Sequence, residues 1–182
     1  MTDRKSDVVR KRVLTASLAL AALVGAGGTA HAQTAVPPSP QEFVNAAAQS
    51  DQYEMLAATA ALAQSRNERV RGYAQAMIDE HQKLDAALRQ ASRAAGLPEP
   101  DPAMSADQAR LLGGLQGLVA ADFDRTYAGQ QVLAHTQAAA VQGSFASAGA
   151  EPHLREAARS AVPMIQDHLT KARQLVEELG KP

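Results

Sequence analysis

The stretch SRNERVRGYAQAMIDEHQKLDAALRQASRAAG, residues 65–96, decides the fold. It begins with Ser65 and Glu68 at the spacing of a capping box, which favours a helix start near residues 66–68. Gly96 followed by Pro98 is typical of a helix end. Apolar residues recur between these signals at every third or fourth position, which predicts a helix with one buried face. That face is Val70, Ala74, Met77, His81, Leu84 and Leu88.

The same start and stop signals divide the rest of the chain into helices. Ser39 before Pro40 predicts a helix that runs to about Gln64, and three prolines predict a loop over residues 97–104. A capping box at Ser105 predicts a short, irregular helix over 105–112, which Gly113 and Gly114 weaken. We expect a long helix over 115–148 and a last helix over 152–179, where Pro163 introduces a kink or marks the true start.

These elements predict an all-α protein. Alanine is abundant and β-branched residues are sparse, which favours helices over strands. Four long helices with short connections predict an antiparallel four-helix bundle, with the short helix between its second and third members. We therefore expect a single domain over residues 40–180.

The first 32 residues have the pattern of a secretory signal peptide. Five basic residues precede an apolar run over 13–24, and the small-residue site Ala30-His31-Ala32 follows. The apolar run is shorter than the roughly 20 residues that span a bilayer, which favours cleavage after Ala32 over a retained anchor. We expect residues 33–39 to form a linker and the mature chain to lie in the periplasm without a transmembrane segment.

Composition excludes several classes of function. The 182 residues include no Cys, which rules out disulfides and thiolate chemistry. A net charge of −1 and only three Phe and three Tyr argue against nucleic-acid binding. No serine lies in the glycine frame of a nucleophile elbow, and no glycine loop precedes Lys-Ser or Lys-Thr, so common hydrolase and nucleotide-binding motifs are absent.

Ionisable residues interrupt the apolar stripes. Within each expected helix pair they lie at similar heights, whereas the irregular segment over residues 97–117 leaves the relation between the two pairs open. Glu54, His81, His135 and His168 are candidate metal ligands, because buried imidazoles and carboxylates need a partner or a metal ion. Mixed nitrogen and oxygen ligands suit Fe, Mn, Zn or Cu. The Glu-x-x-His motif of di-metal bundles is absent, and a buried hydrogen-bond network is the alternative interpretation.

Other polar residues lie close to these candidates in the sequence. Asp79, Glu80 and Tyr127 are possible further ligands, whereas His153, beside Pro152 at a helix start, is expected to be solvated.

Four blocks of sequence resemble the bacterial family catalogued as domain of unknown function 4142. They are Phe43 to Glu54, Val70 to His81, Phe123 to His135, and Pro163 to Leu169. The resemblance covers about Phe43 to Leu175, and it implies an exported, ferritin-like four-helix bundle. Members of the family are often labelled putative outer-membrane proteins. One departure is Glu80 before the second-block histidine, where the family more often has Asp.

Two functions remain open at this point. The first is a non-enzymatic periplasmic protein that binds another protein or acts in envelope stress, because no catalytic motif is recognised. The alternative is a ferritin-like protein that binds metal through the Glu/His residues in its core. An enzyme with carboxylate–histidine acid–base chemistry has less support, because the sequence shows neither a pocket nor a shifted pKa.

Overall fold

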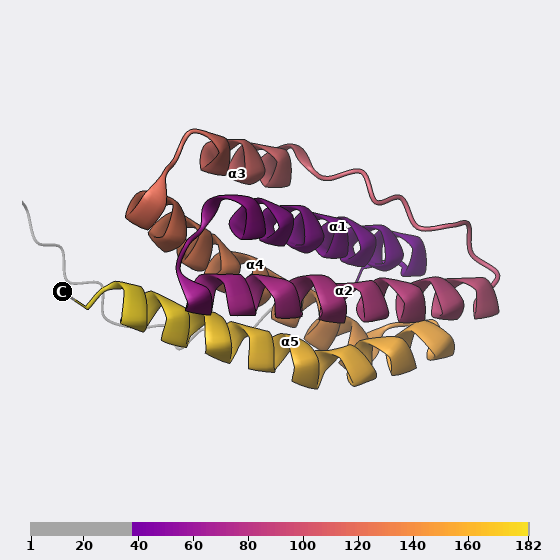
Figure 1. The fold of residues 1–182 in the computed structure, drawn as a ribbon. Helices are drawn as coiled ribbons and strands as arrows, with labels where there is room; N and C mark the ends of the chain where they lie inside the picture. Colours follow the sequence, from indigo (N-terminus) through magenta and orange to yellow (C-terminus); the bar gives the residue numbers. More distant parts are fainter. Residues whose placement is uncertain (1–37, 182) are drawn as a thin grey trace, which may run out of the picture. The chain divides into compact units, whose positions relative to one another are not determined.

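The computed structural model describes residues 38–181, which form five α-helices (Figure 1). In chain order they are α1 (Pro40–Gln64), α2 (Glu68–Ala94), α3 (Ala106–Gln116), α4 (Ala120–Ala148) and α5 (Pro152–Leu179). The described residues contain no strand, so the prediction of an all-α fold is confirmed. The expected signal peptide over 1–32 and residues 33–37 of the expected linker lie outside the described part of the chain.

Local start and stop signals place most helix ends where the sequence predicts them. Ser39 and Glu42 form a complete capping box at α1, and Gly96 adopts a positive φ of 68° after α2. The N-cap of α2 is Asn67 rather than Ser65, because the Asn67 side chain accepts hydrogen bonds from the backbone amides of Arg69 and Val70. α5 is continuous from Pro152, so Pro163 lies inside the helix and does not mark its start.

The segment between α2 and α4 departs most from expectation. α3 continues to Gln116, past both glycines that were expected to end it, and α4 begins at Ala120 rather than near residue 115. Leu115 is fully buried, and its burial offsets the cost of about 1 kcal/mol for each helical glycine. Tertiary packing therefore extends a helix that local propensity alone would stop.

Four long helices form an antiparallel bundle, and α3 lies on its outside. Consecutive helices pair as α1 with α2 and as α4 with α5, and the two pairs meet through α2–α5 and α1–α4 contacts (Figure 1). α3 contacts α1 and α4. No helix in the described residues is both long and apolar enough to cross a membrane.

The buried side chains separate into two apolar clusters with a polar layer between them. One cluster, which we call the tyrosine end, includes Tyr53, Tyr73, Met77, Leu115 and Tyr127. The other, the phenylalanine end, includes Phe43, Val44, Leu88, Phe145 and Leu154. Each of the four long helices contributes residues to both ends, and each also carries at least one buried polar residue near its middle. These residues are Asp51 and Glu54 in α1, His81 in α2, His135 in α4 and His168 in α5, which together form the histidine layer.

Candidate metal centre

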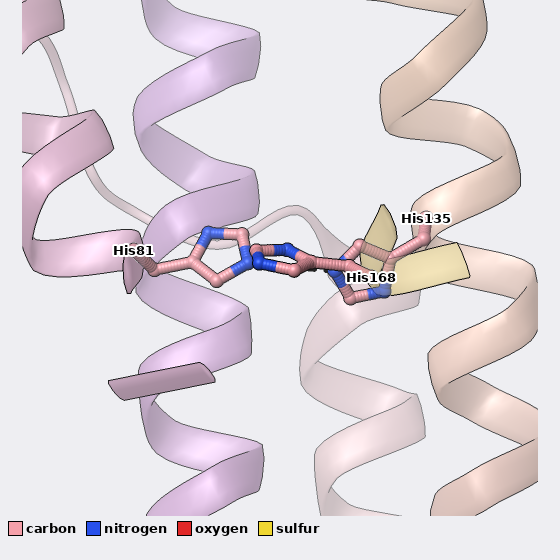
Figure 2. A group of neighbouring side chains, drawn as sticks. All are labelled: His81, His135 and His168. Atoms are coloured by element: carbon pink, nitrogen blue, oxygen red, sulfur yellow. Dashed lines mark hydrogen bonds between the residues drawn. The ribbon is translucent and has the colours of Figure 1, made fainter. Parts of the chain in front are cut away.

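Three histidines from three different helices meet in the histidine layer. His81, His135 and His168 are all buried, and each offers one ring nitrogen so that the three nitrogens lie within 4.8 Å of one another. Figure 2 shows the three rings at one level between the helices, with His81 reaching in from the side opposite His135. The position of each histidine on the apolar stripe of its own helix is what directs it inward. The described residues therefore contain a compact group of imidazoles inside the bundle.

Each histidine uses its other nitrogen to contact a fixed partner. His81 Nδ1 donates to Asp51 Oδ1 at 2.8 Å, and His135 Nδ1 donates to the backbone oxygen of Gln131 at 2.9 Å. His168 Nε2 pairs with Glu80. Carboxylates and carbonyl oxygens behind the imidazoles are the usual means by which proteins orient metal-ligating histidines and fix their tautomers.

With these outer contacts made, the other ring nitrogen of each histidine is left for contacts inside the layer. His81 Nε2 and His135 Nε2 face each other at 3.4 Å, while His168 Nδ1 is buried without a hydrogen-bond partner. Two facing lone pairs repel each other unless a proton or a metal ion lies between them. Tetrahedral coordination with metal–nitrogen bonds of 2.0–2.1 Å places two ligand nitrogens about 3.3–3.4 Å apart. The spacing of the His81 and His135 nitrogens thus fits two ligands of one transition-metal ion, and a nitrogen of His168 lies within 4.8 Å of both.

The electrostatics differ among the three imidazoles. Burial lowers the pKa of His135 to about 3, so its imidazole is neutral and free to act as a ligand. Burial likewise lowers the pKa of His168, although the contact with Glu80 opposes the shift. Burial acts in the same direction on His81, but the hydrogen bond to Asp51 and the charge of Glu54 outweigh it and raise the pKa of His81. His81 is therefore the imidazole of the layer that most readily takes up a proton, and a metal ion must displace that proton to bind there.

Glu54 lies next to the three histidines but outside the group of close ligand atoms. Its Oε1 atom is 3.9 Å from His135 Nδ1, and both carboxylate oxygens are buried without a hydrogen-bond partner in the described residues. Burial raises the pKa of Glu54 to about 7. The Tyr127 hydroxyl and the Gln131 amide, from the face of α4 that carries His135, are likewise buried and unpartnered. Burying polar groups without hydrogen-bond partners lowers the stability of the fold, unless a positive charge or a water molecule lies next to them.

The structure separates the candidates that the sequence grouped together. It brings His81, His135 and His168 into one cluster, with Glu54 beside it. Of the nearby acids, Glu80 contacts His168, whereas Asp79 is exposed and accepts a hydrogen bond from Gln75. His153 is exposed, as expected.

Two residues of the layer were not identified as candidates from the sequence. Asp51 is the partner of His81, and Gln131 supplies the backbone oxygen that holds His135. Their spacing could have identified them. Asp51 lies three residues before Glu54 and Gln131 lies four residues before His135, so each shares a helix face with a candidate ligand.

Comparisons with known proteins place this geometry in context. A solved structure described as "CopM in the Cu(II)-bound form" matches with a TM-score of 0.67 at 13% sequence identity, over 79% of this chain and 99% of that chain. At this identity the similarity concerns the fold. No curated protein matches the sequence. Residues 26–175 match the family model described as "Domain of unknown function (DUF4142)", and the chain therefore belongs to that family.

Proposed function

We propose that this chain binds a single transition-metal ion through His81, His135 and His168. The observation that carries the proposal is the convergence of three imidazole nitrogens within 4.8 Å inside the bundle. Asp51, Glu80 and the Gln131 backbone support it, because each orients one imidazole from behind. In the alternative of a purely structural network, His81 Nε2 shares a proton with His135 Nε2 at 3.4 Å, but His168 Nδ1 stays buried without a partner among the described residues. That unsatisfied nitrogen favours metal binding.

Copper is the first metal to test among Fe, Mn, Zn and Cu. Neutral imidazoles suit Cu, Zn and Fe, and the affinity of a given nitrogen site for divalent metals is highest for Cu(II). The structural neighbour, described as "CopM in the Cu(II)-bound form", supports the same choice. Manganese is the least suited, since it prefers oxygen ligands.

Glu54 has a different role in this proposal from the one the sequence suggested. Its carboxylate lies beside His135 and outside the group of close ligand atoms, so it compensates the charge of a bound cation without being one of the three primary ligands. A divalent ion favours the ionised form of a neighbouring carboxylate, so loading the site would stabilise a negative charge on Glu54.

The proposed location is the periplasm, where the expected signal peptide over residues 1–32 would direct the chain. The proposal is binding without turnover, in keeping with the absence of a recognised catalytic motif in the sequence. The proposal is thus an exported metal-binding protein. A protein partner and a role in envelope stress remain hypotheses that only experiments in cells address.

The direct test is metal content after export. The full chain is expressed with its leader, purified from periplasm without chelator, incubated with Cu(II) and desalted, and its metal is measured by mass spectrometry. The variant His135→Ala removes a neutral ligand without leaving a charge unpaired. His153→Ala is the matched control, because His153 is exposed and away from the layer.

We expect near-stoichiometric copper in the wild-type chain and the control, and a loss of most of it in His135→Ala. Intact mass also reports whether cleavage follows Ala32. The proposal is wrong if the wild-type chain retains no more metal than His135→Ala, or if both histidine variants lose it equally.

A further inference from the structure

A cavity of about 170 Å³ lies beneath α3 and reaches the histidine layer from the outside. Asp51 and His81 form part of its wall, together with Ala138 and Ile165, which lie three residues after His135 and three before His168. The cavity therefore adjoins all three helices that carry the histidines, on the side of the phenylalanine end. It has room for several water molecules.

The chemistry of the cavity wall suits a hydrated cation. None of the described residues that line it is Lys or Arg, and Asp51 supplies a carboxylate. Gln142 adds a side-chain oxygen that is buried and has no hydrogen-bond partner. Ser50 and Gln137 add further neutral polar groups. Oxygen atoms along such a wall replace the hydration waters of an ion as it moves inward.

The outer wall of this cavity is α3, which is weakly attached to the bundle. Ser105, Gln108 and Leu111 of this segment line the cavity, while Leu115 is the one fully buried side chain of α3. Gln130 fastens the helix: its Nε2 donates to the backbone oxygen of Leu111 at 2.9 Å, and its Oε1 accepts from the Tyr53 hydroxyl at 3.0 Å. A short helix with few buried contacts opens at low free-energy cost.

We propose that the cavity beneath α3 is the passage by which a metal ion reaches and leaves the histidine cluster. Movement of α3 away from the bundle opens this passage, and the hydrogen bonds of Gln130 hold α3 in the closed position. The proposal rests on the metal site proposed above, because a passage matters only if the histidines take up metal. A passage lowers the barrier for entry and exit together. Narrowing it therefore slows both rates by the same factor and leaves the dissociation constant unchanged.

The test measures Cu(II) exchange in full-chain variants. All three tyrosines of the chain lie in the cluster next to the histidine layer, so quenching of tyrosine fluorescence reports loading. Uptake is followed by stopped flow with Cu(II) alone, and loss is followed after addition of excess EDTA. Ala138→Leu fills the cavity from α4, and Ala140→Leu is the matched control, because Ala140 is exposed on the same helix and does not line the cavity.

We expect Ala138→Leu to slow uptake and loss by the same factor of about ten or more, with the control unchanged. Gln130→Leu removes the hydrogen bonds to Leu111 and Tyr53, and we expect it to accelerate both metal uptake and metal loss. Ala46→Phe at the exposed rim, with exposed Ala63→Phe as its control, provides a second narrowing variant if Ala138→Leu does not fold.

Wild-type exchange rates in both narrowing variants would overturn the passage while leaving the metal site intact. A change in affinity with one rate unaffected would also overturn it, because that pattern indicates a distorted site. Absence of copper binding by the wild-type chain would overturn the metal site and, with it, the passage.

Discussion

Side chains of the phenylalanine end and of the histidine layer are both buried, but burial contributes to folding stability with opposite sign in the two regions. At the phenylalanine end, Phe43 and Phe145 stack with their ring centroids 4.0 Å apart, and both are fully buried. There, removal from water stabilises the fold directly. In the histidine layer, the fully buried groups are imidazoles and an unpartnered carboxylate, whose removal from water opposes folding.

Inward-facing positions on one helix stripe therefore have two different roles. His81 and Leu88 occupy the same stripe of α2, yet only Leu88 contributes by apolar packing. A bundle that needed stability alone would continue the apolar packing through the middle. The costly groups are confined to the layer that we propose binds a metal ion, and the apolar packing that stabilises the fold lies at the two ends.

The largest expected effect separates stability from binding. Phe43→Ala removes one partner of the stacked pair at the phenylalanine end, which costs about 3–5 kcal/mol of unfolding free energy. The Cu(II) affinity of the remaining folded protein should not change, because Phe43 lies outside the histidine layer. Urea unfolding and a copper titration check the two parts. If the affinity fell as steeply as the stability, the two regions would not be independent. Phe43→Leu serves if the alanine variant does not fold.

Glu54→Gln is expected to stabilise the metal-free protein, and only at high pH. The pKa of Glu54 is raised from 4.5 to about 7 in the folded chain. Below about pH 4.5 the group is protonated in both states, so it costs nothing. Between there and pH 7 the unfolded chain releases its proton first, and stability falls as pH rises, by about 3 kcal/mol in full.

The measurement compares melting temperatures of wild type and Glu54→Gln without metal, near pH 5 and near pH 8. The variant should be several degrees more stable at the higher pH and nearly equal at the lower one. A variant that is less stable near pH 8 would show that the Glu54 charge is already compensated without metal.

Added metal should stabilise the histidine layer independently of the phenylalanine end. Copper at about one hundred times its dissociation constant raises the unfolding free energy by about 2.7 kcal/mol, since it binds the folded state. The gain should be equal in wild type and Phe43→Ala, and absent in His135→Ala. Thermal unfolding with and without Cu(II) measures it. Equal stabilisation of His135→Ala would indicate that copper acts elsewhere on the protein.

The smallest effect concerns the residues behind the ligands. Asp51→Asn removes the negative charge next to His81 Nδ1, and loss of such a partner typically weakens metal binding about 10–100-fold. Asp85→Asn is the matched control, because Asp85 pairs with Arg89 on α2 and does not contact a histidine of the layer. Competition with a chelator measures the affinity. Equal affinities of Asp51→Asn and wild type would remove Asp51 from the site.

Much of the fold follows from local signals that a sequence carries. The Ser39–Glu42 capping box, Gly96 and the apolar stripes of α2 and α5 predict the long helices, because caps and periodicity depend on residues within a few turns of one another. The end of α3 was wrongly predicted, since helical Gly113 and Gly114 depend on Leu115 reaching a core formed by other helices. The helix α5 continues through Pro163, because its packing against α2 and α4 offsets the backbone hydrogen bond that proline removes.

Helical periodicity and short connections suffice to place His81, His135 and His168 on buried stripes, with Glu54 near the height of His81 and His135 near the height of His168. They do not relate the height of one helix pair to that of the other, because the segment over residues 97–117 is irregular. Only the tertiary structure decided that the nitrogens of the three histidines converge within 4.8 Å, that Asp51 and Glu80 orient two of these rings, and that Glu54 lies beside the cluster. The physical reason is that convergence depends on how the two helix pairs rotate against each other. That rotation is set by packing across α1–α4 and α2–α5, between residues far apart in the chain.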